Sequence, residues 1–457
     1  MTAKGSLTEG PIIKGLALFA LPIFLGQVFQ QLYNTADAFI VGKFLSDEEY
    51  AAVTSSGTLI FLLVGLFAGI SVGAGVVIAR YFGAKDEENL HAAVHTTVAL
   101  GLIAGVLLTV IGIVFTPHML RLMGTPESII GYSIEYFRMY FLGSLAISMY
   151  NLLRGVLQAV GDSKSPLYFL MVSSLVNIGL DLLFIGVLGW GVWSAALATT
   201  ISQFLSAALC LVRLMRARGA YRLRLGHVCL RRDKVSEIIR FGLPSGLQNS
   251  IIAIANVVVQ SNINAFGDAA VGACGTYAKL ESFVFLPIMS ITMALTTFVS
   301  QNLGAKQHAR VKKGAAFGIV CCVLVAELVG VMLVLFPEPL IRLFTDNPDS
   351  IAIAIRQTRI ESLFFCLLAF SHCVAAVMRG AGRPTVPMFV MLVAWCVIRV
   401  TYISLVVPFV GDIWVVFSAY PITWGISAIV FAVFFFCTDW IHAYERAEAK
   451  KRRTQVE

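Results

Sequence analysis

The sequence predicts an all-α integral membrane protein with twelve transmembrane helices, in two six-helix lobes related by pseudo-twofold symmetry along the membrane normal. Hydrophobic residues make up 58% of its 457 residues, charged residues only 13%, and the mean hydropathy is +0.83. Apolar runs recur that reach the length of about 20 residues needed to cross a bilayer. The second half of the chain also repeats motifs of the first half, which implies two similar lobes.

The repeat is visible at matched positions 221 or 222 residues apart. Phe19–Pro22 returns as Phe241–Pro244, an offset of 222, and Gly83–Lys85 returns as Gly304–Lys306, an offset of 221. A period this long is typical of a duplicated half-molecule rather than of a solenoid. Because each half has an even number of spans, both halves start from the same side of the membrane and the repeats are parallel.

Clusters of Gly, Pro and polar residues separate the expected spans, as at Gly83–Asp86, Gly124–Pro126 and Gly161–Lys164. We expect spans at residues 13–42, 51–80, 92–115, 129–158, 166–188, 192–214, 239–266, 272–301, 314–336, 351–380, 385–410 and 413–439. The expected domains are an N-terminal lobe (1–218), a cytoplasmic link (219–238), a C-terminal lobe (239–440) and a basic cytoplasmic tail (441–457).

The distribution of Lys and Arg predicts the orientation in the membrane. Alternate loops, the link between the lobes and the C-terminal tail carry the basic residues, whereas the opposite loops carry acidic ones. Both termini and the link are therefore expected in the cytoplasm. The net charge of +8 and the pI near 9.0 reflect these loops, so we expect membrane lipids and no nucleic acid as partners.

Signatures of common enzyme classes are missing from the sequence. There is no GxxxxGK[ST] phosphate loop, so ATP hydrolysis is not expected to drive the protein. There is also no HExxH and no dinucleotide loop, and Gly69–Gly75 in the second expected span is interpreted as a close helix-packing surface. The nine cysteines contain no CxxC and fall mostly in apolar segments, which argues against disulfides and a structural metal. We therefore expect no enzymatic activity, no cofactor, and energy supplied by an ion gradient.

Ionisable side chains inside the spans carry most of the functional information, because a charge at the bilayer centre costs on the order of 2.5–3.5 kcal/mol. In the first span, Gln30, Tyr33 and Asp37 share one helical face. They follow Pro22, which can bend the helix. Asp37 could form a site, or it could be an acid at the external end of the helix, since Gly42 follows soon after.

The fifth and sixth spans add Asn177, Asp181 and Thr199. Asn177 and Asp181 are four residues apart and share a helical face. With Asp37 they offer hard oxygen ligands for a proton or a small cation such as Na⁺. Because burial and a neighbouring carboxylate both favour a protonated carboxyl group, such a pair can bind and release protons near neutral pH. The alternative is a set of isolated polar groups, each satisfied by another helix.

Other charges within the spans are less informative. Arg359 and Glu361 are close in sequence and are expected to neutralise each other. Glu281 could attract a cationic substrate or could pair with Lys279. His372 is expected to be a satisfied polar group within the bundle, with a proton relay as the alternative.

The motifs of this chain resemble those of the multidrug and toxin extrusion (MATE) transporters, in a bacterial branch. The resemblance covers essentially the whole chain. In the first half it rests on Ala20–Pro22, Asn34–Asp37 with Gly42, Arg154–Asp162 and the Asn177…Asp181 pair; in the second half on Leu243–Pro244 and Met378–Gly382.

The resemblance implies an antiporter of the bacterial inner membrane that exports organic cations and amphipathic drugs in exchange for H⁺ or Na⁺. We expect a monomer, although the sequence leaves the oligomeric state open. The family's coupling site matches Asp37, Asn177, Asp181 and Thr199, and its helix hinge matches Pro22. Residues of its substrate cavity match Gln30, Tyr33, Tyr136 and Asn151. The alternative is a lipid-linked precursor flippase of the same superfamily, which usually has more spans and a cationic cavity.

The duplication does not extend to the candidate ion site. Asn177, Asp181 and Thr199, shifted by 221, fall on Ile398, Tyr402 and Tyr420. Another bacterial branch of the family carries a glutamate in the seventh span, whereas the stretch Gln248–Ile252 has no acid. We therefore expect the ion site in the first lobe.

Overall fold

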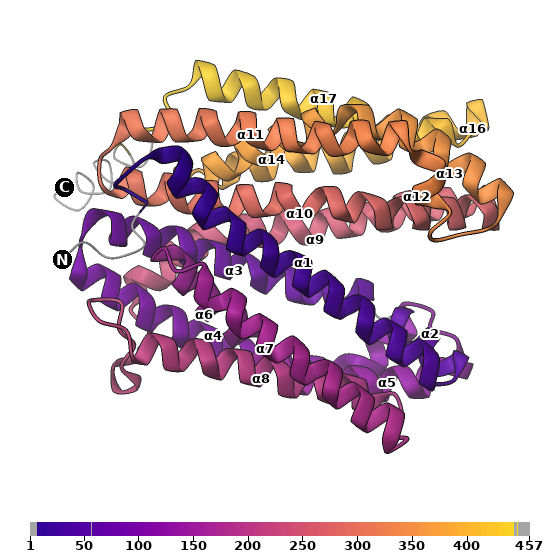
Figure 1. The fold of residues 1–457 in the computed structure, drawn as a ribbon, viewed down its shortest axis with the longest axis horizontal. Helices are drawn as coiled ribbons and strands as arrows, with labels where there is room; N and C mark the ends of the chain where they lie inside the picture. The colour runs from indigo at the N-terminus through magenta and orange to yellow at the C-terminus, as the bar shows by residue number, and fades with distance from the viewer. Residues whose placement is uncertain (1–6, 56, 443–445, 447–457) are drawn as a thin grey trace. The chain divides into compact units, whose positions relative to one another are not determined.

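The computed structural model describes residues 7–55, 57–442 and 446, in which every regular element is helical (Figure 1). The elements of the first half are α1 (Ile12–Phe44), α2 (Asp47–Ser55), α3 (Gly57–Ala84), α4 (Glu87–Leu122), α5 (Glu127–Leu142), α6 (Ser144–Ala159), α7 (Lys164–Asp181), η1 (Leu182–Val187), α8 (Trp193–Met215) and η2 (Leu225–His227). Those of the second half are α9 (Arg232–Asn264), α10 (Asp268–Gly304), α11 (His308–Leu335), α12 (Pro337–Ile341), α13 (Pro348–Glu361), η3 (Ser362–Phe364), α14 (Phe365–Gly380), α15 (Thr385–Met391), η4 (Leu392–Ile398), α16 (Arg399–Val410) and α17 (Trp414–Cys437).

These elements follow the twelve expected spans. Of the helices described, ten are long and apolar enough to cross a membrane. The expected span 51–80 covers the end of α2 and most of α3, on either side of residue 56, which lies outside the described residues. The expected span 129–158 is divided between α5 and α6 at Gly143, where an added Cβ would meet the Thr200 hydroxyl of α8. A close approach of α8 therefore accompanies this break, which hydropathy alone does not reveal.

The backbone of the turns confirms the internal repeat. Lys85 and Lys306, which are 221 residues apart, are the two non-glycine residues of the described chain with positive φ, at 55° and 58°. Gly161 and Gly382, again 221 apart, have φ of 89° and 82°. Left-handed conformations are uncommon for residues with a Cβ. Their recurrence at one spacing shows that both halves use the same turn geometry.

The chain forms two compact units, and each is described by itself. Unit 1 contains Leu21–Gly246, and unit 2 contains Leu7–Ala20 together with the chain from Leu247 onward. Both α1 and α9 are therefore divided between the units, α1 next to Pro22 and α9 next to Pro244. The expected boundaries (1–218, 219–238, 239–440) follow the repeat, whereas packing places the link and the first part of α9 in unit 1. The tail expected at 441–457 lies mainly outside the described residues.

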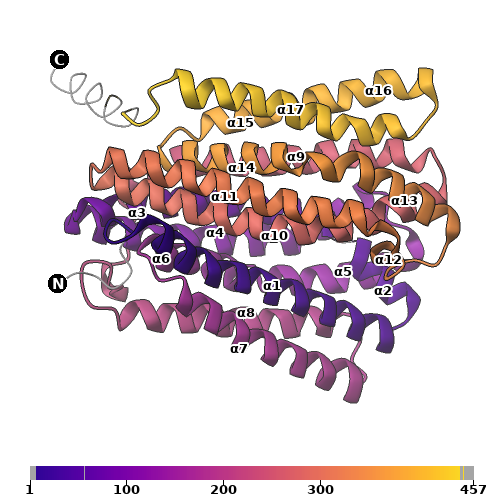
Figure 2. The same ribbon diagram turned by 45° about the horizontal axis from the view of Figure 1, so that its top comes forward.

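Small residues allow the helices of each unit to pack closely. In unit 1 the first part of α9 lies against α3, where a Cβ added to Gly73 would come within 2.6 Å of the Gly242 Cα. Also in unit 1, α7 packs along α8, and in unit 2 α16 packs along α17 (Figure 2). π-helical turns follow α7 directly at η1 and precede α16 at η4. Such turns are often found at functional sites.

Candidate ion-coupling site

The candidate site of unit 1 is built where the second half of α1 meets α5, the end of α7, η1 and α8. The buried cluster Ile40, Val41, Ile185 and Ala195 holds these elements together, and Tyr136 packs against it. Because helices within a membrane associate through van der Waals packing, this close-packed cluster fixes the helices around the polar residues next to it. Asp37 of α1 and Asp181 of α7 are three and four residues from Ile40 and Ile185 of this cluster.

Asp37 and Asp181 come together in the structure, as the sequence predicts for a paired site. Their carboxyl groups are close enough to interact directly. Asp181 is completely buried, and Asn177, one helical turn earlier on α7, is 1% exposed. The alternative of Asp37 as an isolated acid at a helix end does not fit this arrangement, because a second carboxyl group from another helix faces it.

Five buried polar atoms of Asp37, Asn177 and Asp181 have no hydrogen-bond partner in the described chain. Within the described residues, both carboxyl oxygens of Asp181, both polar atoms of the Asn177 amide and Oδ1 of Asp37 are buried without a hydrogen-bond partner. A buried polar group without a partner costs about 1–3 kcal/mol, so such groups are uncommon in folded proteins. Two carboxyl groups and an amide oxygen can share a proton, and they are also the hard oxygen ligands of a small cation.

Tyrosines surround the two carboxyl groups. Tyr33 and Tyr136 both lie close enough to Asp37 and Asp181 to interact electrostatically. Tyr140 of α5 joins them, with its ring centroid 6.4 Å from that of Tyr136. The sequence indicated Tyr33 and Tyr136 but not Tyr140, although the spacing of four residues on α5 places Tyr136 and Tyr140 on one helical face.

The sequence also predicted roles for Thr199, Gln30 and Pro22, which lie on α8 and α1. Thr199 is half-buried on α8 and makes no side-chain hydrogen bond within the described residues. Gln30 is half-buried on α1, two helical turns before Asp37, and Pro22 is buried inside the same helix. Their roles as ligand, cavity residue and hinge stay predictions.

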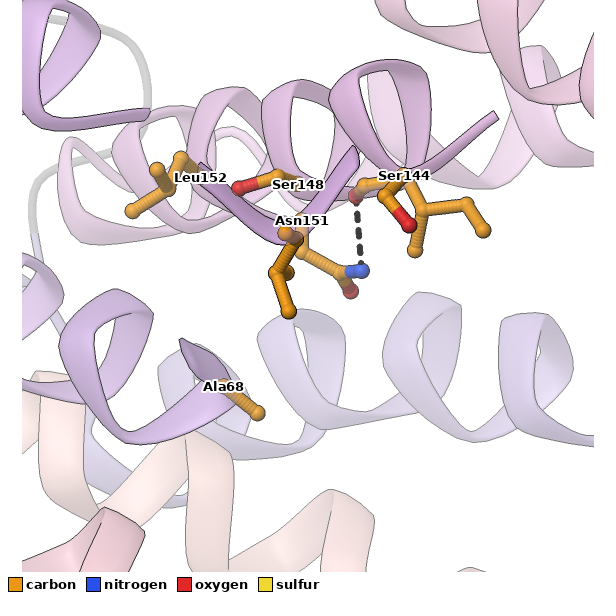
Figure 3. Close-up of a pocket in the computed structure, with 7 residues that line it drawn as sticks. Ala68, Ser144, Ser148, Asn151 and Leu152 are labelled. Carbon is orange, nitrogen blue, oxygen red and sulfur yellow. Dashed lines mark hydrogen bonds between the residues drawn. The ribbon is translucent and has the colours of Figure 1, made fainter. Parts of the chain in front are cut away.

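Asn151 lies elsewhere in unit 1, at a small cavity between α3, α4 and α6 (Figure 3). Its amide donates to the Ile147 carbonyl at 2.9 Å and accepts from Arg154 at 3.3 Å. Figure 3 shows Asn151 with Ser144, Ser148 and Ala68 at this cavity, whose volume is about 10 Å³. Such a space holds about one water molecule. A drug would need a wider cavity in order to contact Asn151 here.

A second charged cluster is buried in unit 2. Glu361 of α13 is 1% exposed and accepts a 2.8 Å hydrogen bond from Gln357, while Arg399 of α16 is 4% exposed. The Arg399 guanidinium lies 4.1 Å from the ring centroid of Tyr420. Half-buried Glu281 of α10 is close enough to interact electrostatically with Arg399 and Glu361.

Two pairings are not formed in the described chain: the one expected between Arg359 and Glu361, and the one that the sequence left open between Lys279 and Glu281. Arg359 is exposed whereas Glu361 is buried, so the expected mutual neutralisation is wrong: the two residues point to different surroundings. Lys279 is also exposed and lies 5.6 Å from the ring centroid of Phe344, away from an ion pair with Glu281. Each pair is two residues apart, and side chains two residues apart on a helix do not face each other, which explains both outcomes. The nearby bases Lys279 and Arg359 suggested other partners for the two acids, so the sequence did not indicate the cluster of Glu281, Glu361 and Arg399.

His372 also differs from the simple expectation. Its Nε2 is buried without a hydrogen-bond partner in the described chain, and its ring packs edge-on against Trp395, with centroids 5.3 Å apart. The expectation of a satisfied polar group is thus wrong for this atom. A role as a relay stays a prediction.

Comparison with known proteins identifies the family. The family model MatE matches residues 22–183 and 244–403, two blocks that begin at Pro22 and Pro244. The "Probable multidrug resistance protein YoeA" of Bacillus subtilis is 30% identical over 388 residues, which cover 83% of this chain and 84% of that protein. The "Probable multidrug resistance protein NorM" of Thermotoga maritima is 28% identical over 396 residues, covering 84% and 83%.

Solved structures agree with this assignment. The structure of a MOP superfamily transporter from Pyrococcus furiosus superposes with a TM-score of 0.89 at 26% identity and covers 95% of this chain and 97% of that chain. Together with the ten apolar helices of the described chain, this likeness confirms the expected multi-pass, all-α membrane fold of twelve helices. The chain belongs to the MATE family of membrane transporters, as its sequence motifs predicted.

Proposed function

We propose that this chain is a secondary active efflux transporter that exchanges organic cations or amphipathic drugs for H⁺ or Na⁺. The observation that carries the proposal is the close pair Asp37 and Asp181: both carboxyl oxygens of Asp181 and Oδ1 of Asp37 are buried without a hydrogen-bond partner in the described chain. The names of two relatives, both called probable multidrug resistance proteins, support the class of cargo. Both termini are placed in the cytoplasm of a bacterial cell by the distribution of basic residues.

The chemistry of the site suggests how exchange would work. Two neighbouring carboxylates in a medium of low dielectric repel each other, and a bound proton or cation removes that repulsion. Ion binding at Asp37 therefore changes the charge on α1, and Pro22 offers the point at which this helix can bend. In the proposed cycle, the conformation with the ion bound has low affinity for the substrate, so that one is released as the other binds. The coupling site lies in the first lobe.

Asp37→Asn tests the proposal in cells. Ethidium efflux by cells that produce this variant is expected to fall below about one tenth of the wild-type rate, because the amide can no longer exchange a proton or neutralise a cation. Asp268→Asn, which removes an exposed acid at the start of α10, is the matched control and is expected to retain efflux. Wild-type efflux by Asp37→Asn would contradict the proposed site. Lipid movement without any drug efflux would favour a flippase instead.

Glu281→Gln tests whether the charged cluster of unit 2 contacts the cargo. Because Glu281 is half-buried near Arg399 and Glu361, we expect its carboxylate to face the substrate cavity. The variant is expected to raise the KM for ethidium by about threefold to tenfold, the loss of one charge interaction, with little change in kcat. Glu338→Gln, at an exposed ion pair with Arg342, is the control. An unchanged KM would remove Glu281 from the cavity.

A further inference from the structure

The segment Leu7–Gly10, which immediately precedes α1, is held on unit 2 by Arg310. The guanidinium donates four hydrogen bonds to three backbone carbonyls of this segment: Nη1 to Gly10 at 2.7 Å, Nη2 to Glu9 at 3.0 Å and to Leu7 at 3.1 Å, and Nε to Leu7 at 3.3 Å. Gly10 has φ of +74°, a left-handed conformation that favours glycine and turns the chain toward α1.

Arg310 lies on α11, and two side chains of α10 also bind the same segment. The Leu7 amide donates to Gln301 Oε1 at 2.9 Å, and Asn302 Nδ2 donates to the Leu7 carbonyl at 3.3 Å. Both amide side chains are fully buried, and Leu7 is 5% exposed. The segment is therefore held in a defined position, because the backbone groups of Leu7 form hydrogen bonds with buried side chains.

Arg310 has an unusual set of partners for a charged residue. Within the described residues it forms no ion pair, and its donors go to backbone carbonyls of the segment. A guanidinium stays charged at all physiological pH values and presents its donors in a rigid plane. Hydrogen bonds from a charged donor are roughly twice as strong as those from a neutral donor. This contact is therefore strong and does not depend on pH.

The held segment leads directly into the helix that carries the candidate ion site. Leu7–Ala20 belongs to unit 2, whereas α1 from Leu21 onward belongs to unit 1. Figure 1 shows α1 as one unbroken helix across this division, with Pro22 inside it. From Pro22 to Asp37 the helix rises about 22 Å. One end of α1 is thus fixed to unit 2, and the other carries Asp37 in unit 1.

The second half of the chain repeats the arrangement with other residues. The segment before α9 is held on unit 1, where Thr96 Oγ1 donates to the Cys229 carbonyl and accepts from the Arg231 amide, both at 3.3 Å. α9 then passes from unit 1 to unit 2 after Gly246, next to Pro244. The first helix of each half therefore begins on the opposite unit. In the segment before α1, the charged side chain of Arg310 donates to the backbone carbonyls.

We propose that Arg310 is a positioning residue for transport, which acts by fixing the start of α1 to unit 2. With that end fixed, a change of charge at Asp37 bends α1 at Pro22. With that end free, the same change would merely shift the start of the helix. The proposal rests on the proposed function, since it assigns Arg310 a part in the same transport cycle.

Arg310→Ala in the full-length protein tests the proposal by hydrogen exchange and by transport kinetics. Amides of residues 7–20 are expected to exchange about tenfold faster in the variant, because the local opening of this segment becomes easier, while those of 30–44 are unchanged. Ethidium turnover is expected to fall about fivefold or more, with KM and equilibrium ethidium binding within about twofold of wild type. Arg310→Lys, which keeps the charge but not the planar donors, is expected to recover part of both signals.

Arg342→Ala provides the control. Arg342 is also a surface arginine, but it binds the Glu338 carboxylate at 2.8 Å, and its loss is expected to change neither readout. Faster exchange with unchanged turnover in Arg310→Ala would overturn the proposal, since the contact would then be structural only. Unchanged exchange would also overturn it. If Arg310→Ala does not fold, Arg310→Lys replaces it. Faster exchange together with wild-type turnover in Arg310→Lys would then overturn the proposal. If the wild type fails to transport, the proposed function is wrong, while exchange still shows whether Arg310 holds the segment.

Discussion

Asp181→Asn is expected to abolish ion-driven efflux and to yield protein at least as stable as the wild type. Asp181 is completely buried, its two oxygens have no hydrogen-bond partner in the described chain, and the Asp37 carboxyl group faces it. A neutral amide of similar shape removes the repulsion between the two acids, so the free energy of unfolding is expected to rise by up to about 1–3 kcal/mol. Loss of function together with gained stability is typical of a residue kept for activity.

Two measurements, one on purified protein and one on membrane vesicles, check this expectation. The first is the melting temperature in detergent, where Asp181→Asn is compared with wild type and with Asp268→Asn. The second is the efflux rate in membrane vesicles from the same cells. A lower melting temperature combined with normal efflux would mean that Asp181 is a structural residue, which would remove the basis for the proposed site.

The second large effect concerns packing in unit 1. Gly73→Ala is expected to lower the free energy of unfolding by about 1–3 kcal/mol, because the added methyl group would overlap the backbone of α9 at Gly242. Backbone atoms cannot move aside as a flexible side chain can. The helices α3 and α9 would have to separate, and the yield of folded protein would fall.

Gly75→Ala, two residues further along the same helix, is the matched control. No atom lies within 4 Å of a Cβ added at Gly75, so this substitution is expected to be neutral or to stabilise the helix by about 0.5–1 kcal/mol. Thermal unfolding monitored by size-exclusion chromatography in detergent compares the two variants. Equal melting temperatures for Gly73→Ala and Gly75→Ala would contradict the close packing of α9 on α3.

The fold was largely predictable from the sequence, because hydropathy depends on the local sequence and the repeat is found by comparing the two halves directly. The spacing of Gly83–Lys85 and Gly304–Lys306 anticipated two turns with the same left-handed backbone. The division of α5 from α6 at Gly143 was not predictable, because Thr200 of α8 approaches from 57 residues away along the chain. The change of unit within α1 and α9 was hidden as well, since a repeat shows which segments are alike and not where they pack.

The candidate site divides in the same way. Asp37, Asn177 and Asp181 stood out because acids and amides are rare in apolar helices, and the structure brings them together. The cluster of Glu361 and Arg399 was missed because its members are distant in sequence, and Glu361 had a nearby Arg359 as its obvious partner. Arg310 is one of many basic residues between the expected spans, so the sequence did not single it out. Its role depends on backbone carbonyls, which leave no signal in the sequence.

Transport by the purified protein in proteoliposomes tests the central claim most directly. A pH gradient and a Na⁺ gradient are imposed separately, and ethidium movement is followed for the wild type and for Asp181→Asn. We predict that at least one of the gradients drives ethidium against its own gradient in the wild type, and that neither gradient does so in Asp181→Asn. Movement that is independent of both gradients, or equal in the two proteins, would contradict an ion-coupled site at Asp37 and Asp181.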